Sequence, residues 1–504
     1  MDWRTLFRSE PLRVPSDPCD VLPRILTDAL RAGMGPAKAE PAASDFVAIR
    51  ADELLNIDQR LRSYRSDAYR HWALGTLHAV GACPLVDDVR SALLFIACSH
   101  PDGRERQKAV WRLAEFPGYL TLAAALVRCA DWAAPVRFAA RDAVVQLLSQ
   151  CDPDEVVSAW PLVLRLKQRE RSGEEWLVEN VDCWMLAPGN REALHLALES
   201  RTPSVRRWAY QQAVARGDDI LLPALLQPDP RIGLHALRHA GTTLGAKGLG
   251  DLAAAGLKAP HPVIRRESLR ALATTDNAAA AAALPRALLD RSVGVRRLAA
   301  FLTRQSGSDP REAWRAALDH PSVPFPLGAL ASLAEEPENQ DAGRMRRLLL
   351  ADRPIVRQLA LKGLLKTGES VSPDEFSKLL ELGGRRVLAA LNTAVCDSAI
   401  CLDSGLIQHV LASDHVGEAG RIAMRKLLNT GGLWDRLDQL LGLRIADSDF
   451  LWWLTAADDW IRRSEAYAPL GDVRKRALLS ALTDRVSELG ADRSVRITDA
   501  LRRY

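Results

Sequence analysis

The residues that could do chemistry in this chain are a histidine pair, a cysteine pair and several adjacent carboxylates. His235 and His239 are four residues apart, so on a helix they would face one side and could share a metal ion. Cys396 and Cys401 are two thiols separated by four residues. A tetrahedral zinc site needs four ligands, and no further Cys, Asp or Glu set completes either pair. The sequence therefore predicts no metal and no other cofactor.

Acidic pairs and nucleophile motifs do not form a catalytic set either. Glu174 and Glu175, like Asp458 and Asp459, are paired in sequence only, because adjacent residues on a helix point about 100° apart. The chain has no Gly-x-Ser-x-Gly elbow, no phosphate loop ending in Gly-Lys-Ser/Thr and no Gly-x-Gly-x-x-Gly after a strand. We expect a protein that is not an enzyme and has no small-molecule substrate.

Arginine carries a stronger pattern, Val/Ile-Arg-x-x-Ala/Ser, which occurs five times. The copies begin at Val136, Val205, Ile264, Val295 and Val356. They recur at one or two multiples of roughly 30 to 35 residues, the spacing of helical-pair repeats. Degenerate copies at residues 229–232 and 320–323 fill two of the gaps, and weaker copies follow around Val387 and Arg421. We count about ten units.

The clearest unit shows why such hairpins must stack. Residues 278–289 are predicted to form a first helix, residues 290–294 a turn, and residues 295–305 a second helix that ends at Gly307. Val295, Leu298, Ala299 and Leu302 place one apolar stripe along the second helix. Because a single hairpin can bury this stripe only against neighbouring hairpins, the units are expected to propagate as a stack.

The Asp/Pro-rich turn followed by Val-Arg-x-x-Ala resembles HEAT repeats, particularly the short HEAT-like form first associated with phycobilin lyases. The resemblance covers about residues 100 to 430. It implies an all-α fold, a right-handed α-α superhelix (α-solenoid) of about ten HEAT-like helical hairpins. Some proteins with such repeats resemble iron-dependent hydroxylases that use His-Glu pairs, but this chain has no His-Glu dipeptide. Others resemble DNA glycosylases, although no acid or aromatic catalytic set of that kind is recognisable here.

The flanks of the repeat region differ in composition, which predicts four segments. Residues 1–45 form a proline-rich lead-in with one short helix at 21–32, and residues 46–100 form an N-terminal helical cap. Residues 101–443 form the repeat solenoid, and residues 444–504 form a C-terminal helical cap.

Charge and cysteine usage limit the partners and the compartment. Lys and Arg number 67 against 63 acidic residues, a balance that neither requires nor excludes a polyanionic partner. The eight cysteines contain no Cys-x-x-Cys pair, which suits a reducing compartment. We find no signal-peptide pattern and no apolar run long enough to cross a bilayer, so a cytoplasmic protein without membrane contact is expected.

The arginines of the repeat fall into two sets. The first set is Arg137, Arg206, Arg265, Arg296 and Arg357, which occupy one repeat position. Asp131, Asp290 and Asp352 precede three of them by five or six residues, where they could cap the helix and pair with the guanidinium of their own or the next repeat. This set is interpreted as mainly structural. The second set is Arg207, Arg266 and Arg297, with Arg270 and Arg304 on the same helix faces.

In HEAT-like solenoids the second helices line the concave surface, so the resemblance places the second set in an inner groove. Only Glu267 offsets it in the sequence. The predicted macromolecule-binding residues are Arg206, Arg207, Arg265, Arg266, Arg270, Arg296, Arg297 and Arg304. The predicted function is a non-enzymatic scaffold that holds a protein partner on the concave or terminal surface. The alternative is a nucleic-acid-binding protein that uses the arginine groove.

Tryptophan clusters offer a second interpretation of where a partner could bind. Trp160, Trp176 and Trp184 lie in an eroded unit, and Trp452, Trp453 and Trp460 lie near the C-terminus. Core filling explains them first, whereas any exposed member would be an anchor for a protein partner.

Overall fold

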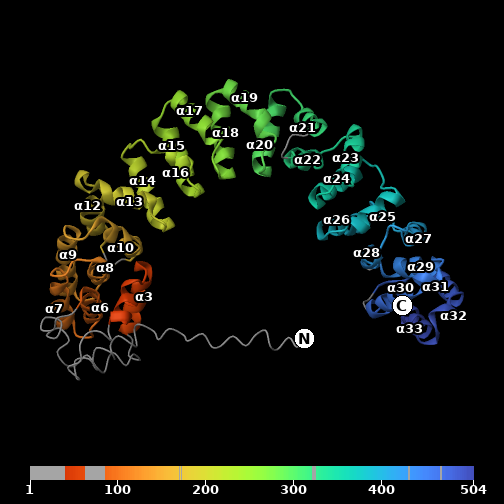
Figure 1. Cartoon of the computed structure of the whole chain (residues 1–504), viewed down its shortest axis with the longest axis horizontal. Coiled ribbons are helices and arrows are strands. Elements are labelled where there is room, and N and C mark those ends of the chain that lie inside the picture. The colour runs from red at the N-terminus through yellow and green to blue at the C-terminus, as the bar shows by residue number, and fades with distance from the viewer. Residues whose placement is uncertain are drawn as a thin grey trace. The chain divides into compact units, whose positions relative to one another are not determined.

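The computed structural model describes residues 40–62, 86–169, 171, 173–320, 325–428, 432–465 and 468–503. Every regular element within these ranges is a helix, and no strand occurs among them (Figure 1). Neighbouring helices pack in pairs, and within each of the two compact units described below each hairpin contacts the next one. The prediction of an all-α solenoid is therefore confirmed.

The chain divides into two compact units, which are described separately. Unit 1 comprises Met1–Gly248 and Ala259–His261, and unit 2 comprises Leu249–Lys258 and Pro262–Tyr504.

Unit 1 consists of short helices stacked in chain order. Its helices are α2 (Glu40–Val47), α3 (Ala51–Leu61), α6 (Asp87–Ala97), α7 (Gly103–Leu113), α8 (Tyr119–Arg128), α9 (Ala134–Leu148), α10 (Pro153–Leu166), α11 (Glu174–Leu177), η4 (Val178–Asp182), α12 (Cys183–Leu186), η5 (Pro188–Asn190), α13 (Arg191–Glu199), α14 (Pro203–Ala215), α15 (Leu221–Leu225) and α16 (Pro230–Thr243). Helix α17 (Ala246–Gly256) spans the boundary between the units.

Helix α8 is the most deeply buried helix of this stack. It packs against α6 and α10 within its own layer, against α7 and α9, and against α3. All residues from Leu120 to Arg128 are consequently buried. The end of α8 is the part of unit 1 where charged side chains enter the interior.

Unit 2 repeats the hairpin more regularly. Its helices are α18 (Pro262–Thr275), α19 (Asn277–Ala287), α20 (Val293–Gln305), α21 (Pro310–Asp319), α22 (Leu327–Leu333), η6 (Asn339–Asp341), α23 (Ala342–Leu348), α24 (Pro354–Lys366), α25 (Pro373–Leu382), α26 (Arg385–Cys396), α27 (Ser404–Ala412), α28 (Glu418–Leu428), α29 (Leu433–Gly442), η7 (Asp447–Asp449), α30 (Phe450–Arg463), α31 (Asp472–Thr483), α32 (Val486–Leu489) and α33 (Ala491–Arg503).

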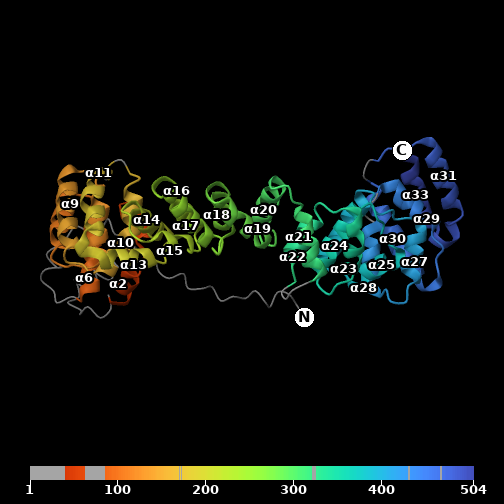
Figure 2. The ribbon, with the colours of Figure 1, turned by 90° about the horizontal axis from the view of Figure 1, so that it is seen from above.

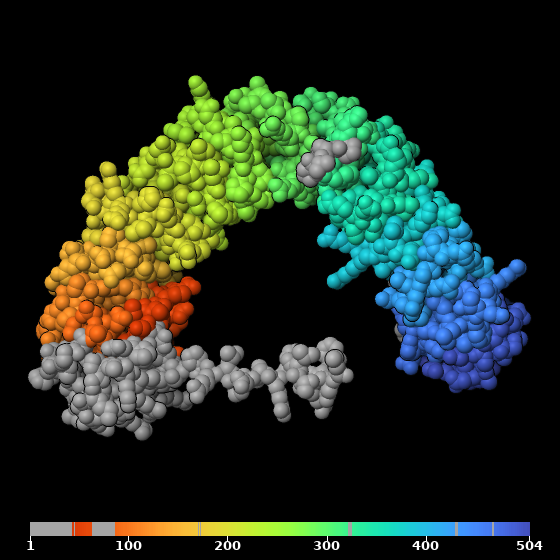
Figure 3. All heavy atoms as spheres, in the orientation of Figure 1, coloured from red at the N-terminus to blue at the C-terminus, as the bar shows by residue number. Residues whose placement is uncertain are grey.

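The second helices of the unit 2 hairpins lie along one side. In Figure 1, α20, α24 and α26 follow the inner side of the unit, while α19, α23 and α25 follow the outer side. Figure 2 shows the same order of helices after a rotation of 90°. The two helices of each hairpin are therefore neighbours in space and not only in projection. In the space-filling view the colour changes gradually along each unit, because hairpins contact their neighbours in the chain (Figure 3).

Local sequence explains where the second helices begin. Helices α14, α16, α18 and α24 start with proline, whose missing N–H costs nothing at a helix N-terminus and whose fixed φ favours the first turn. Before α16, the Asp229 carboxylate accepts a hydrogen bond from the main-chain N–H of Arg231. At the other end of α20, Gly307 adopts a φ of 82°, a left-handed conformation that favours glycine.

The example hairpin is confirmed with small shifts. The first helix, predicted at 278–289, is α19 from Asn277 to Ala287, and the second, predicted at 295–305, is α20 from Val293 to Gln305. The predicted helix at 21–32 and most of the copy at 320–323 lie outside the described residues. The boundaries at 45, 100 and 443 stay predictions.

No described helix of the chain is both long and apolar enough to traverse a lipid bilayer.

Candidate functional site

The repeated arginine of the motif holds the turn that precedes its own helix. In α20, the Nη1 atom of Arg296 donates hydrogen bonds to the carbonyls of Asp290 and Arg291, at 2.9 and 3.0 Å. Its Nε atom donates to the Ser332 hydroxyl in the next repeat at 2.8 Å. The residue is only 5% exposed. Arg296 therefore joins its own turn to the following hairpin.

Other repeats use the same bond at the same register. In each, an arginine donates through Nη1 to the carbonyl six residues earlier, in most cases also to the carbonyl five residues earlier. These pairs are Arg106 with His100 and Pro101, Arg137 with Asp131 and Trp132, Arg206 with Ser200, and Arg357 with Ala351 and Asp352. We call these residues, with Arg296, the turn-clamp arginines. Their recurrence supports the structural interpretation of the first set.

Asp290, the aspartate of the turn before α20, pairs with an arginine of the preceding repeat, which is not the expected partner. Asp290 accepts from the main-chain N–H of Ser292 at 2.7 Å, as a cap should. Its carboxylate also accepts two bonds from Arg265, at 2.8 and 2.9 Å, and Arg265 belongs to the preceding repeat. Burial raises the pKa of Asp290, but the bonds from Arg265 and Ser292 lower it further, so the net direction is downward. The expected partner was the arginine of the same or the next repeat, but that arginine is occupied with main-chain carbonyls.

The four second-set arginines of unit 2 each face a carboxylate. Arg266 and Arg270 both bind Glu267, with the shortest nitrogen–oxygen separations at 3.0 and 2.6 Å. On α20, Arg297 lies 3.3 Å from Glu335, and Arg304 pairs with Glu336. The expectation that only Glu267 offsets this set is therefore wrong. Glu335 and Glu336 follow α22 and are more than 30 residues away in sequence, so the motif could not reveal them.

An exposed aromatic residue lies between the two arginines of α20. Phe301 is four residues after Arg297 and three before Arg304, so the three side chains share one face of the helix. Its side chain remains 55% exposed. Phe301 was not predicted from the sequence, although its spacing on the helical wheel of α20 places it beside the arginines.

The two predicted site residues of unit 1 are partly engaged within the chain. Arg206 is a turn-clamp residue, and the Nε atom of Arg207 lies 2.5 Å from the Asp229 carboxylate. The pKa of Asp229 is lowered, because hydrogen bonds from Arg231 and Arg207 outweigh the effect of burial.

The candidate metal ligands stay isolated. Within the ranges that the structure describes, no group of three or more His, Cys, Asp or Glu side chains could hold a metal ion. His235 is half-buried, and its pKa is lowered by burial and by the nearby His239 and Arg238.

Asp458 binds Arg493 at 2.7 and 2.9 Å, and Asp459 binds Arg425 at 3.2 Å. These carboxylates therefore serve ion pairs.

The tryptophans near the C-terminus fill the core, as the first interpretation held. Trp452, Trp453 and Trp460 are at most 9% exposed. Each donates its indole N–H to a main-chain carbonyl. Among the described residues, the strongly exposed tryptophans are instead Trp111 and Trp132 in unit 1, which were not predicted from the sequence.

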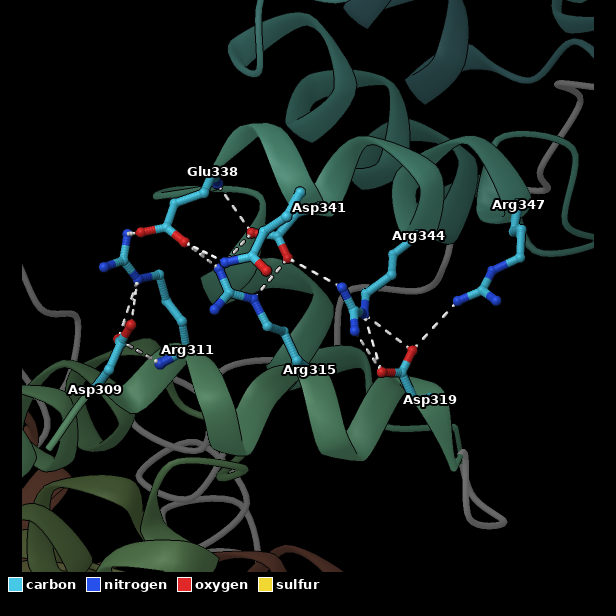
Figure 4. A network of polar contacts seen from close by, with 9 residues as sticks. Asp309, Arg311, Arg315, Asp319, Glu338, Asp341, Arg344 and Arg347 are labelled. Carbon is cyan, nitrogen blue, oxygen red and sulfur yellow. Dashed lines mark hydrogen bonds and ion pairs between the residues drawn. The ribbon is translucent and has the colours of Figure 1, made fainter.

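A network of ion pairs joins two first helices of unit 2 (Figure 4). Arg315 on α21 binds both oxygens of Asp341, at 2.8 and 3.0 Å, and also Glu338 at 2.6 Å. Arg344 on α23 reaches back to Asp319 at 2.6 Å. The labelled members are Asp309, Arg311, Arg315, Asp319, Glu338, Asp341, Arg344 and Arg347, four positive and four negative side chains. Because its charges balance, this network is a structural contact between hairpins.

Comparisons with known proteins add one distant structural similarity. No protein-family model and no curated protein matches the sequence. Among solved structures, the chain is similar to the one titled "Crystal Structure of Importin Beta in an Ammonium Sulfate Condition". The alignment covers 96% of this chain and 79% of that chain, at 14% identity and a TM-score of 0.22. With so low a TM-score, the similarity carries no argument about fold or function.

Proposed function

We propose that this chain is a non-enzymatic scaffold that holds a protein partner. We place one contact surface on α18 and α20 of unit 2. It consists of Arg266, Arg270, Arg297, Phe301 and Arg304, and we call it the α20 face. The observation that carries the proposal is the exposed Phe301 between Arg297 and Arg304. Aromatic residues and arginine are the side chains most enriched at binding hot spots, where an apolar anchor is framed by polar contacts.

The ion pairs on this face suit exchange with a partner's carboxylates. Arg297 and Arg304 are paired on the surface, with side chains 71% and 47% exposed. Exposed pairs of this kind contribute only about 0 to 1 kcal/mol. An acidic side chain of a partner can therefore replace Glu335 or Glu336 at little cost. The expected partner segment presents acidic residues around an apolar one.

Charge favours a protein partner over the competing proposal of nucleic acid. Four arginines on the α20 face are opposed by Glu267, Glu335 and Glu336, so this group carries a net charge of one. A protein that makes roughly 6 to 10 phosphate contacts needs a much larger cationic excess. The predicted site residues Arg206, Arg265 and Arg296 contribute to this proposal by fixing the turns.

Three finer features belong to the same proposal. The short second helices, such as the 13-residue α20 and α24, support the short HEAT-like form associated with phycobilin lyases. The ion pairs formed by Asp458 and Asp459 support a protein without catalytic activity. The buried thiols of Cys98, Cys129 and Cys151 support a reducing compartment such as the cytoplasm.

The experiment is site-specific photo-cross-linking in cells. A photoreactive amino acid replaces Phe301 in one variant and Val473 in a matched control, because Val473 is also strongly exposed in unit 2 but lies on α31. We expect a discrete protein adduct at position 301 that is absent at position 473. The captured protein is then purified, and it must bind wild-type chain directly. Identical adducts at both positions, or adducts with nucleic acid only, would contradict the proposal.

A further inference from the structure

The ends of three helices in unit 1 line an open cavity of about 600 Å³. Its walls come from the C-terminal halves or ends of α3 and α8, the turn after α8, and residues that follow α10. A cavity of this size accommodates a small organic molecule. Residues of unit 1 alone form it.

The side chains around this cavity carry an excess of positive charge. Among the described residues, Arg62, Arg169 and Arg171 line it together with one acidic residue, Asp58. Arg62 reaches from the wall into the protein, where its Nη2 atom lies 3.0 Å from Asp131 and its Nε atom 3.4 Å from Asp58. The wall is thus continuous with a buried ion network.

That buried network is itself rich in arginine. Asp131 is fully buried and accepts from Arg106, at 2.8 and 2.9 Å, and from Arg128 at 3.1 Å. Arg128 also pairs with Asp58, and the Ser99 hydroxyl donates to Asp58 at 2.7 Å. Counted over the described residues, the wall and the network together contain five arginines and two aspartates, an excess of three positive charges. The C-terminal end of a helix carries the equivalent of roughly −0.5 elementary charge. Three such ends together offset about 1.5 of the three positive charges, so about half of the excess charge remains.

The cavity also offers an aromatic surface and two amides. Trp132 lines it and is 61% exposed, while the guanidinium of Arg106 lies 5.3 Å from the centre of its ring. This contact orients the indole and leaves much of it open. Gln59 and Gln168 add groups that can both donate and accept hydrogen bonds.

We propose that this cavity binds a small phosphorylated ring compound, with a nucleoside monophosphate as the chemical prototype. The planar guanidinium groups of Arg62, Arg169 and Arg171 suit a phosphate, which arginine binds through paired N–H donors. The ring packs against Trp132, and the amides of Gln59 and Gln168 meet its polar edge. This is a binding site and not a reaction site, and it is independent of the α20 face in unit 2.

Isothermal titration calorimetry on the full chain tests this proposal. AMP, CMP and phenyl phosphate are the probes, with inorganic phosphate and adenosine as the two halves of the prototype. We expect at least one phosphorylated ring compound to bind tenfold or more tightly than either half. No heat with any of the three, or equal affinity for inorganic phosphate, would overturn the proposal.

Matched variants then locate the site. Arg171→Gln and Trp132→Ala each change an exposed residue of the cavity, and Arg104→Gln and Trp111→Ala change exposed residues of α7 outside it. The cavity variants are expected to weaken binding at least fivefold, and the α7 variants to leave it within twofold. Equal effects of the two classes would also overturn the proposal. Circular dichroism of each variant shows whether the fold is retained.

Discussion

Arg296 and Arg297 are consecutive residues of α20 but occupy opposite environments. Arg296 is 5% exposed and bonded to its own turn and to Ser332, whereas the Arg297 side chain is 71% exposed beside Glu335. One arginine maintains the stack, and we propose that the other contacts a partner.

Replacing the two neighbours by alanine should therefore give unequal losses of stability. Arg296→Ala leaves two carbonyls and a hydroxyl without their charged donor, and we expect a loss of about 2 to 4 kcal/mol. Arg297→Ala removes an exposed pair and should cost less than about 0.5 kcal/mol. Urea unfolding followed by circular dichroism measures both. Equal losses would refute the distinction between clamp and surface arginines.

Gly328 offers a separate test of how closely the hairpins approach. A Cβ at this position would lie 2.8 Å from the carbonyl oxygen of Asp290 and 3.0 Å from that of Leu289, in the turn held by Arg296. Gly328→Ala should therefore destabilise unit 2 by roughly 1 to 2 kcal/mol, although alanine favours helix.

Gly343 is the matched control, because a Cβ there meets nothing within 4 Å. Gly343→Ala should be neutral or stabilise by up to about 1 kcal/mol. If both variants stabilise the chain in thermal melts, the close contact at Gly328 is not real.

The sequence was sufficient to predict the hairpins but not their lateral contacts. The Val-Arg-x-x-Ala motif located α20 within two residues, because a buried stripe and an obligatory clamp recur at fixed spacing. It could not reveal that Glu335 and Glu336 face the arginines of α20, since those residues come from the next hairpin. The network around Asp341 was missed for the same reason, because its residues come from two successive hairpins and lie outside the motif.

Acid should weaken the contact between α21 and α23. A hydrogen bond from Arg344, with further attraction from Arg347, lowers the pKa of Asp319. Burial raises the pKa of Asp341, but the bonds from Arg315 and the Glu338 N–H lower it more. Because the folded pKa values lie below the unfolded value near 3.8, this stabilisation is complete above that pH and is lost as pH falls through the folded values.

Urea midpoints measured between pH 3 and pH 6 check this prediction. The wild-type midpoint should decline below about pH 4. The urea midpoint of Asp319→Asn should be lower than that of the wild type near neutral pH. It should also decline less as the pH falls, because one of the titrating groups has been removed. A midpoint that increases as the solution is acidified would contradict the assignment of these ion pairs.

The cysteines should separate into two classes of reactivity. Burial raises the pKa of Cys129 to about 12 and that of Cys151 to about 11, so both stay protonated near neutral pH. The exposed group comprises Cys183, Cys396 and Cys401, and the buried group comprises Cys98, Cys129 and Cys151. Maleimide followed by peptide mass spectrometry should modify the exposed group first and the buried group only in denaturant. Labelling of native Cys129 as fast as Cys183 would show that the α8 region is not packed as described.

The affinity of the partner captured at Phe301 is the most direct test of the proposed function. We expect Phe301→Ser to weaken binding at least tenfold, because the apolar anchor is lost, and Arg297→Glu with Arg304→Glu to weaken it further at low salt. Val473→Ser is the matched control and should bind like the wild type. If Phe301→Ser and Val473→Ser bind the purified partner equally well, the α20 face is not the surface by which this chain holds another protein.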